Sequence, residues 1–241
     1  DPFLTWLVGF VEGDGSFFVG SKGLGFDLTQ HSNSIDLLYK IKKTLGFGAV
    51  VYRNSPIIQA SGASVRNRHV GVYTVSSKAN FLKLIHLFNG RLVLPYRQAQ
   101  FSIWLKAYNT RYGASIPLLS AAGGRSVSFQ NAWLSGFIDA EGCFTSRLRP
   151  CGTSKHGQSL VVAFSITQKT ACVLKYIRNV FHIKHGQIRY DPSWDGYEFQ
   201  LGHKKKLKPL VAYLNRYKLK TCKRLQFDVW AKIHRVHLDS S

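Results

Sequence analysis

A thirteen-residue segment of this chain occurs twice, first at residues 5–17 and again at residues 132–144. The two copies read TWLVGFVEGDGSF and AWLSGFIDAEGCF, and corresponding residues lie 127 positions apart. A repeat at about half the length of a 241-residue chain favours two similar halves, each with its own core. This constrains the fold strongly, because both halves must then contain the same elements in the same order.

Hydrophobic periodicity predicts the same order of elements after each copy. In the first half we expect a motif helix ending at Gly15, a turn at 22–25, and these further elements: strands near 16–21, 26–30, 49–53 and 70–76, and helices near 34–45, 78–88 and 97–111. In the second half the motif helix precedes these elements: strands near 143–149, 159–168, 186–190 and 197–201, and helices near 171–182, 205–215 and 221–236.

We therefore predict an α+β fold of two pseudo-symmetric αββαββα halves with antiparallel sheets. The halves cover residues 1–112 and 129–241. Between them, residues 113–128 (GASIPLLSAAGGRSVS) are rich in Gly, Ser and Ala, which is typical of a linker.

The charge of the chain indicates a polyanionic partner. Its net charge is +21, from 33 Lys+Arg against 12 Asp+Glu. Nucleic acid is the usual partner of such a chain, although composition alone fits a generically basic protein, such as a ribosomal one, about as well. No stretch of 18 apolar residues is present, so we expect no membrane-spanning helix.

Small residues recur four positions apart in each motif. They are Gly9 and Gly13 in the first copy, and Gly136 and Ala140 in the second. On a helix such residues share one face and allow another helix to approach closely. We expect the motif helices to pack on each other at a pseudo-two-fold axis through these four residues.

The last acid of each motif, Asp14 or Glu141, directly precedes a glycine at the expected helix end. With the helices packed, these two carboxylates are expected to meet near the axis. A carboxylate at a helix C-terminus costs about 0.3–1 kcal/mol, and two facing carboxylates repel further. A divalent cation with oxygen ligands is the simplest compensation. A metal beside a basic surface predicts phosphodiester hydrolysis; the alternative is a helix-packing motif with exposed acids.

The segments LVGFVEGDG (7–15) and LSGFIDAEG (134–142) resemble the two motifs of single-chain LAGLIDADG homing endonucleases. The resemblance covers essentially the whole chain, including the repeated order of elements. It implies a monomer whose two antiparallel sheets form a saddle over double-stranded DNA.

The same resemblance implies a magnesium site with catalytic acids. The metal ligands would be Asp14, Glu141 and the carbonyls of Gly13 and Ala140, with Ca²⁺ or Mn²⁺ as substitutes in binding or assays. The remaining motif acids, Glu12 and Asp139, are not the family's usual ligands and are interpreted as helix-end or supporting residues.

Four further residues are predicted to support catalysis. The repeat places Gln30 opposite Gln168 at strand ends, where the family often has a polar residue that positions solvent; the alternative is a strand cap. Arg97 and Lys223 begin the last helix of each half, where the family often has a basic residue near the active site. LKTCK (219–223) fits that pattern better than VLPYR (93–97), which suggests two unequal active sites.

Strand alternation predicts a polar sheet face that contacts DNA, because Arg and Gln can read guanine and adenine in the major groove. The alternative for any single residue is a solvated face. The predicted DNA-contacting residues are Arg53, Thr74, Arg147, Arg149, Gln187, Arg189 and Gln200.

Together these features predict a site-specific double-strand DNA endonuclease with a long, asymmetric target. The first alternative is an RNA maturase of the same fold, whose partner would be its host intron RNA. The second is a non-catalytic DNA-binding regulator, which the intact acids disfavour. The resemblance also implies an organellar, mitochondrial location.

Overall fold

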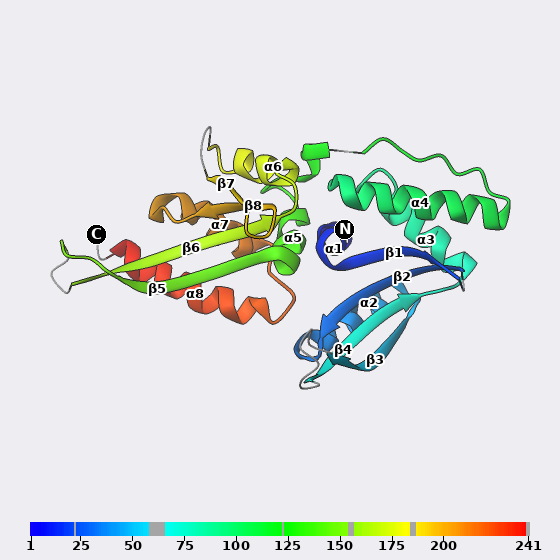
Figure 1. The fold of residues 1–241 in the computed structure, drawn as a ribbon, viewed down its shortest axis with the longest axis horizontal. Helices are drawn as coiled ribbons and strands as arrows, with labels where there is room; N and C mark the ends of the chain where they lie inside the picture. Colours follow the sequence, from blue (N-terminus) through cyan, green and yellow to red (C-terminus); the bar gives the residue numbers. More distant parts are fainter. Residues whose placement is uncertain (22, 58–65, 122, 154–156, 184–186, 240–241) are drawn as a thin grey trace. The chain divides into compact units, whose positions relative to one another are not determined.

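A computed structural model describes residues 1–21, 23–57, 66–121, 123–153, 157–183 and 187–239 (Figure 1). The chain forms two compact units. The N-terminal unit comprises Val11–Gly123, and the C-terminal unit comprises Asp1–Phe10 together with Gly124–Ser241. The division at 1–112, 113–128 and 129–241 stays a prediction, drawn on the repeat rather than on contacts.

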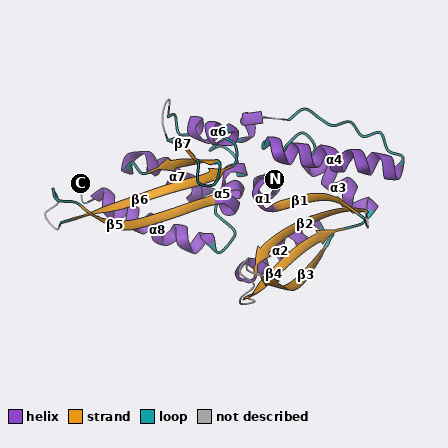
Figure 2. Ribbon diagram, in the orientation of Figure 1, coloured by secondary structure: helices purple, strands orange, loops and turns teal. Residues whose placement is uncertain are grey.

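The elements of the first half follow one another closely along the chain. They are α1 (Pro2–Asp14), β1 (Gly15–Gly20), β2 (Gly23–His31), the short 3₁₀ helix η1 (Ser32–Ser34), α2 (Ile35–Leu45), β3 (Ala49–Ile57), β4 (Arg66–Val75), α3 (Lys78–Phe88) and α4 (Pro95–Tyr112). The strands form an antiparallel sheet in the order β1-β2-β4-β3 (Figure 2).

The second half repeats this order after the 3₁₀ helix η2 (Gly123–Ser126). Its elements are α5 (Trp133–Glu141), β5 (Gly142–Pro150), β6 (Gln158–Gln168), α6 (Cys172–Val180), β7 (Ile188–Asp191), β8 (Gly196–Leu201), α7 (Lys204–Arg216) and α8 (Lys223–Asp239). The strand order β5-β6-β8-β7 matches that of the first sheet. The predicted α+β class and the two antiparallel, pseudo-symmetric halves are confirmed.

Two details of the first half differ from prediction. The glycines expected in a turn at 22–25 instead open β2, because Gly23 pairs with Gly20 and Gly25 with Phe18. The hairpin after Arg53 is also more extended than expected, since β3 continues to Ile57 and β4 begins at Arg66. Lys22 of the predicted turn, and residue 186 of the predicted strand near 186–190, lie outside the described residues.

Each half buries an aromatic core between one face of its sheet and its last helix. Phe17 of β1 lies 5.5 Å, ring to ring, from Trp104 of α4, and Phe144 of β5 lies 5.1 Å from Trp230 of α8. Both indole N–H groups donate across the sheet, Trp104 to the Gly25 carbonyl at 2.9 Å and Trp230 to the Ala163 carbonyl at 3.0 Å. These contacts hold α4 and α8 in fixed positions on the two sheets.

The motif helices pack through their glycines, as predicted for Gly9 and Gly136. A Cβ atom on Gly9 would overlap the Trp133 carbonyl oxygen, and one on Gly136 would overlap the Trp6 carbonyl oxygen. Because backbone atoms cannot move aside as side chains can, only glycine allows this approach. The packing lies inside the C-terminal unit, which includes residues 2–10 of α1. The packing roles of Gly13 and Ala140 stay predictions.

Within the described residues, no helix combines the length and apolarity needed to cross a membrane.

Candidate active site

Asp14 is the last residue of α1, and its carboxylate is held by a strand residue of the same unit. Gln30, near the end of β2, donates from Nε2 to Asp14 Oδ2 at 2.7 Å and to the Thr29 carbonyl at 2.8 Å. Both Asp14 and Gln30 are half-buried, so the carboxylate lies at a surface rather than inside the core. The structure thus brings together two of the residues predicted for the site.

Arg97 of α4 binds the end of α1. Its guanidinium donates to the Glu12 carbonyl from Nε at 3.1 Å and from Nη2 at 2.9 Å, and to the Gly13 carbonyl from Nη2 at 3.0 Å. The last carbonyls of a helix have no partner within the helix and carry partial negative charge. The buried guanidinium therefore satisfies these acceptors. It also places a positive charge on the carbonyl of Gly13, the residue that precedes Asp14.

Lys223 makes the equivalent contact in the C-terminal unit. Its Nζ donates to the Ile138 carbonyl at 3.1 Å and to the Ala140 carbonyl at 3.2 Å, both near the end of α5. Glu141, the last residue of α5, is half-buried like Asp14. Gln168 ends β6, where its backbone pairs with Tyr197, and its predicted role at the site stays a prediction. The predicted meeting of Asp14 with Glu141 likewise stays a prediction.

The other two motif acids are buried, with relative exposures of 1% for Glu12 and 3% for Asp139. Glu12 accepts the backbone N–H groups of Val93 and Leu94, the latter at 3.2 Å. Burial raises the pKa of Glu12 to about 7, although these two N–H groups and Arg97 act to lower it. The Glu12 oxygens are thus engaged by the backbone.

Asp139 is held by an even denser set of donors. Its Oδ1 accepts the Thr221 N–H at 3.1 Å and the Thr221 hydroxyl at 2.6 Å. Its Oδ2 accepts the Lys220 N–H at 2.7 Å and the Trp6 indole N–H at 2.9 Å. Burial raises the pKa of Asp139, and these hydrogen bonds oppose the rise.

The sequence predicts Glu12 and Asp139 as helix-end or supporting residues but does not reveal these partners. A signal for them exists in the repeat: Val93 lies 81 positions after Glu12, and Lys220 lies 81 positions after Asp139. The spacing alone does not predict these hydrogen bonds. The donors are the backbone N–H groups of Val93 and Lys220, and the side chains of these two residues have nothing in common.

The predicted DNA-contacting residues that lie within strands of the second sheet share one face, whereas Gln187 precedes β7 in a left-handed conformation (φ 66°). The register pairs Cys143 with Ser165 and Ser165 with Gln200, so Arg147 and Arg149, on alternate residues of β5, lie on the same face as Gln200. Phe144 lies on the opposite face, against α8. The polar face is therefore the one that the helices leave uncovered.

The individual side chains on this face differ in their surroundings. Arg147, Arg149, Gln187, Arg189 and Gln200 are all exposed. Arg189 forms an ion pair with Glu198, with 3.2 Å between Nη2 and Oε2. In the first sheet, half-buried Thr74 pairs with Asp27 and Ala49, while Arg53 belongs to β3 and its side chain lies outside the described residues.

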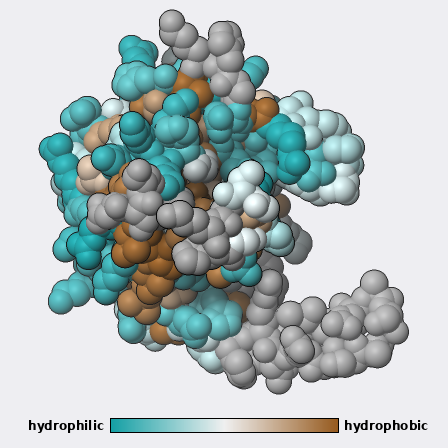
Figure 3. Space-filling view, turned by 90° about the vertical axis from the view of Figure 1, so that its left-hand side faces the viewer, coloured by the Kyte–Doolittle hydropathy of each residue, from teal (hydrophilic) through white to brown (hydrophobic). Residues whose placement is uncertain are grey.

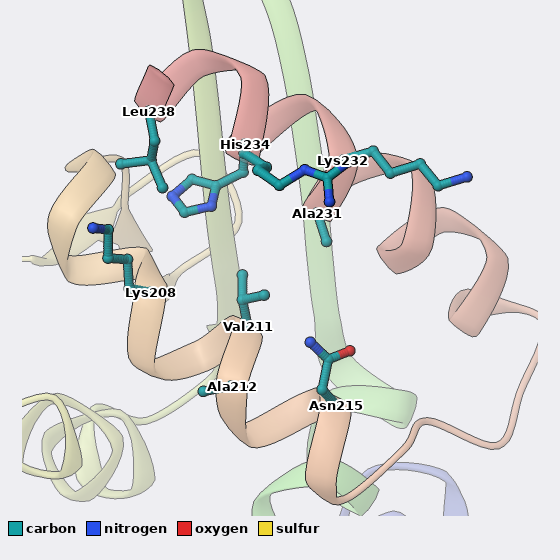
Figure 4. A pocket seen from close by; sticks show the side chains of 9 residues that line it. Lys208, Val211, Ala212, Asn215, Ala231, Lys232, His234 and Leu238 are labelled. Atoms are coloured by element: carbon teal, nitrogen blue, oxygen red, sulfur yellow. The ribbon is translucent and has the colours of Figure 1, made fainter. Parts of the chain in front are cut away.

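A hollow of about 480 Å³ lies elsewhere, between α7 and α8 (Figure 4). Its described lining includes Lys208, Val211, Lys232 and His234 but no Asp or Glu. Figure 3 shows a face of the molecule where apolar surface lies among hydrophilic surface. The hollow therefore lacks the carboxylate ligands that the motif-helix ends offer.

The repeat and its sheets match a known family along most of the chain. Residues 7–108 and 134–234 both match the family model of the LAGLIDADG endonucleases. The chain belongs to the LAGLIDADG endonuclease family. The predicted family is thus confirmed, and each match to the family model begins within a motif helix.

Curated relatives of this family member are longer proteins. "Probable intron-encoded endonuclease 4" of Neurospora crassa is 37% identical over 239 residues, which are 98% of this chain and 41% of that protein. "Intron-encoded RNA maturase bI4" of Saccharomyces cerevisiae is 28% identical over 196 residues, which are 81% of this chain and 26% of that protein. The chain therefore spans less than half the length of these two relatives.

Solved structures of the family share the fold. The LAGLIDADG meganucleases I-CpaMI and I-AabMI, both described as bound to uncleaved DNA, each match with a TM-score of 0.76 over 98% of this chain and 92% of theirs. Their sequence identities are 16% and 18%. At this identity the likeness establishes the fold of the two halves.

Proposed function

We propose that the chain is a site-specific, Mg²⁺-dependent endonuclease that hydrolyses both strands of a long, asymmetric DNA target. The observation that carries the proposal is the division of the four motif acids. Asp14 and Glu141 are half-buried at the helix ends, whereas Glu12 and Asp139 are buried against backbone donors. This division supports the last acid of each motif, rather than the earlier one, as the metal ligand.

The atoms at the two helix ends fit a hard divalent cation. Asp14 with the Gly13 carbonyl, and Glu141 with the Ala140 carbonyl, offer oxygen atoms only, the ligands preferred by Mg²⁺ and Ca²⁺. A carbonyl oxygen has two lone pairs, so a bond from Arg97 or Lys223 does not use its whole acceptor capacity. Within the described residues no group of three or more His, Cys, Asp or Glu forms a competing metal site.

We propose Mg²⁺ as the natural ion, with Ca²⁺ or Mn²⁺ as substitutes in binding or assays. When bound, the metal would activate water and stabilise the charge on the departing oxygen. Gln30 would fix the orientation of the Asp14 carboxylate through its 2.7 Å hydrogen bond. Arg97 and Lys223 would offset the negative helix ends and so ease the approach of a phosphate.

Duplex DNA is the partner that the charge and the sheet face support. The net charge is +21, and the uncovered face of the second sheet presents Arg147, Arg149 and Gln200. The likeness to meganucleases described as bound to DNA agrees with this partner. We propose that the protein acts as a monomer, since each of its halves supplies one motif.

An organellar, mitochondrial location is part of the same proposal. It is supported by relatives from Schizosaccharomyces pombe named for cox1 introns, because cox1 is a mitochondrial gene.

The test is selection of a cleaved site from a random duplex DNA library in Mg²⁺, followed by cutting of that site by variants. Asp14→Asn and Glu141→Gln are each expected to abolish cutting while leaving binding in Ca²⁺ largely intact. Full cutting by both variants, or no cut site for the unaltered protein, would contradict the proposal.

A second candidate function is RNA maturation. The observation that favours it is the Saccharomyces cerevisiae relative named as an RNA maturase. A splicing assay with the host intron separates the two functions, because a maturase with no nuclease role would promote splicing without cutting any selected DNA.

A further inference from the structure

The earlier acid of each motif binds the backbone just before the last helix of its half. Glu12 accepts N–H groups from Val93 and Leu94, and α4 begins at the next residue, Pro95. Asp139 accepts N–H groups from Lys220 and Thr221, shortly before α8 begins at Lys223. Both acids thereby attach the start of a helix to the motif helix.

A basic side chain in the first turn of the same helix also contacts the motif helix. Arg97, two residues into α4, donates to the carbonyls of Glu12 and Gly13. Lys223, the first residue of α8, donates to the carbonyls of Ile138 and Ala140. Each half therefore contains a closed set of hydrogen bonds, called the circuit below. The motif-helix acid binds the backbone before the last helix, and the basic residue of that helix binds the end of the motif helix.

The circuit is most direct in the C-terminal unit. The Thr221 hydroxyl donates to Asp139 Oδ1 at 2.6 Å, and its oxygen accepts the Lys223 N–H at 3.2 Å. A single side chain thus connects the buried acid to the backbone of the basic residue. Since a flexible lysine loses considerable rotamer entropy when its head is fixed, an anchored backbone lowers the cost of placing Nζ on the Ala140 carbonyl.

We propose that Glu12 and Asp139 are positioning residues, which hold the helix starts so that Arg97 and Lys223 stay on the last carbonyls of the motif helices, beside Asp14 and Glu141. The inference rests on the proposed endonuclease function and deepens it. Neither acid touches metal or DNA in this role, because the oxygens of each are engaged by the protein's own donors. Each acid should therefore affect cutting of the same DNA strand as the basic residue that it positions.

The first test compares Asp139→Asn with Lys223→Ala on a selected DNA target labelled separately on each strand. Asparagine keeps the volume but turns an NH₂ group toward N–H donors, so the helix start should shift. We expect Asp139→Asn to slow cutting about 10- to 100-fold, the usual effect of losing a supporting hydrogen-bond partner. The slowed strand should be the one slowed by Lys223→Ala, and binding in Ca²⁺ should be unchanged.

A double substitution shows whether the acid acts through the lysine. Asp139→Asn combined with Lys223→Ala is expected to cut no more slowly than Lys223→Ala alone, because the acid then has no basic side chain left to position. Effects that multiply would mean separate roles and would overturn the proposal. Equal slowing of both strands by Asp139→Asn, together with loss of Ca²⁺-supported binding, would also overturn it.

Milder variants at Thr221, with a control at Asp228, keep the proposal testable if Asp139→Asn fails to fold. Thr221→Val removes the hydroxyl bridge with little change in volume, whereas Thr221→Ser retains it, so only the valine variant should slow the same strand. Asp228→Asn, in the half-buried Arg224–Asp228 pair of α8, makes the same charge change outside the circuit and should cut normally. If the unaltered protein cuts no selected DNA, the proposed function fails; if it cuts but Thr221→Val has no effect, only the positioning role fails.

Discussion

In both halves a basic side chain donates to the carbonyl just before the last motif acid, Gly13 or Ala140, but the two halves do so by different means. In the first half, a planar guanidinium reaches the last carbonyls of α1 from the third residue of α4. In the second half, an ammonium reaches those of α5 from the first residue of α8. Arg97 follows Leu94 by three positions, whereas Lys223 follows Thr221 by only two.

This difference shows which feature of the site the fold requires. The basic residue changes in type and in helix position, yet a positive group still contacts the carbonyl before the last acid. Glycine, by contrast, occurs in both copies where the motif helices touch. Where two helix backbones touch, only glycine fits. A carbonyl, by contrast, can be reached by a long basic side chain from more than one position on the neighbouring helix.

The largest expected effect is the loss of stability on replacing either glycine. Gly9→Ala and Gly136→Ala each place a methyl group on a tryptophan carbonyl of the facing helix. We expect each to lower the free energy of unfolding by roughly 3 kcal/mol, the upper end of overpacking costs. Chemical denaturation measures this. Gly152→Ala, where an added Cβ meets nothing within 4 Å, is the control and should change little. A small effect at one motif glycine only would break the equivalence of the halves.

The second prediction sharpens the contrast between the basic residues. Arg97 is 5% exposed and also donates from Nη1 to Gln100 Oε1, so its bonds spread over the whole guanidinium. Arg97→Lys cannot reproduce them and is expected to cost about 1–3 kcal/mol of unfolding free energy. Lys223→Arg should cost less, because Lys223 is half-buried and its two bonds start from one atom. Equal losses in denaturation would show that the two contacts are interchangeable.

The smallest expected effect on stability belongs to the sheet face. The side chain of Arg189 is 74% exposed, and its ion pair with Glu198 should contribute only about 0–1 kcal/mol. Arg189→Ala should therefore leave the unfolding midpoint almost unchanged. It should weaken binding to the selected DNA more than Lys232→Ala, which removes the same charge from α8, outside the sheet face. Equal affinities for the two variants would argue against DNA contact by this face.

Much of the fold followed from the sequence because its signals are local. The helix at 78–88 matches α3 to the residue, and the motif helices end where Gly15 and Gly142 follow. The segment with Gly23 and Gly25 predicts a turn from its composition, whereas pairing with β1 makes it a strand. Side-chain type is what makes Asp14, Gln30, Arg97 and Lys223 candidates in the sequence. The structure shows Gln30 on Asp14, and Arg97 and Lys223 on the ends of the motif helices, while their catalytic roles stay predictions.

The sequence by itself determined the repeat, the two halves and the acids that end the motif helices, since hydrophobic period and glycine position act over a few residues. Only the tertiary structure decided that Glu12 and Asp139 are buried while Asp14 and Glu141 are not. The partners that the two buried acids share are backbone N–H groups 81 and 82 positions away; Asp139 adds the Thr221 hydroxyl and the Trp6 indole. Every residue except proline carries a backbone N–H donor, so no residue type in the sequence could mark which of these N–H groups a buried acid would bind.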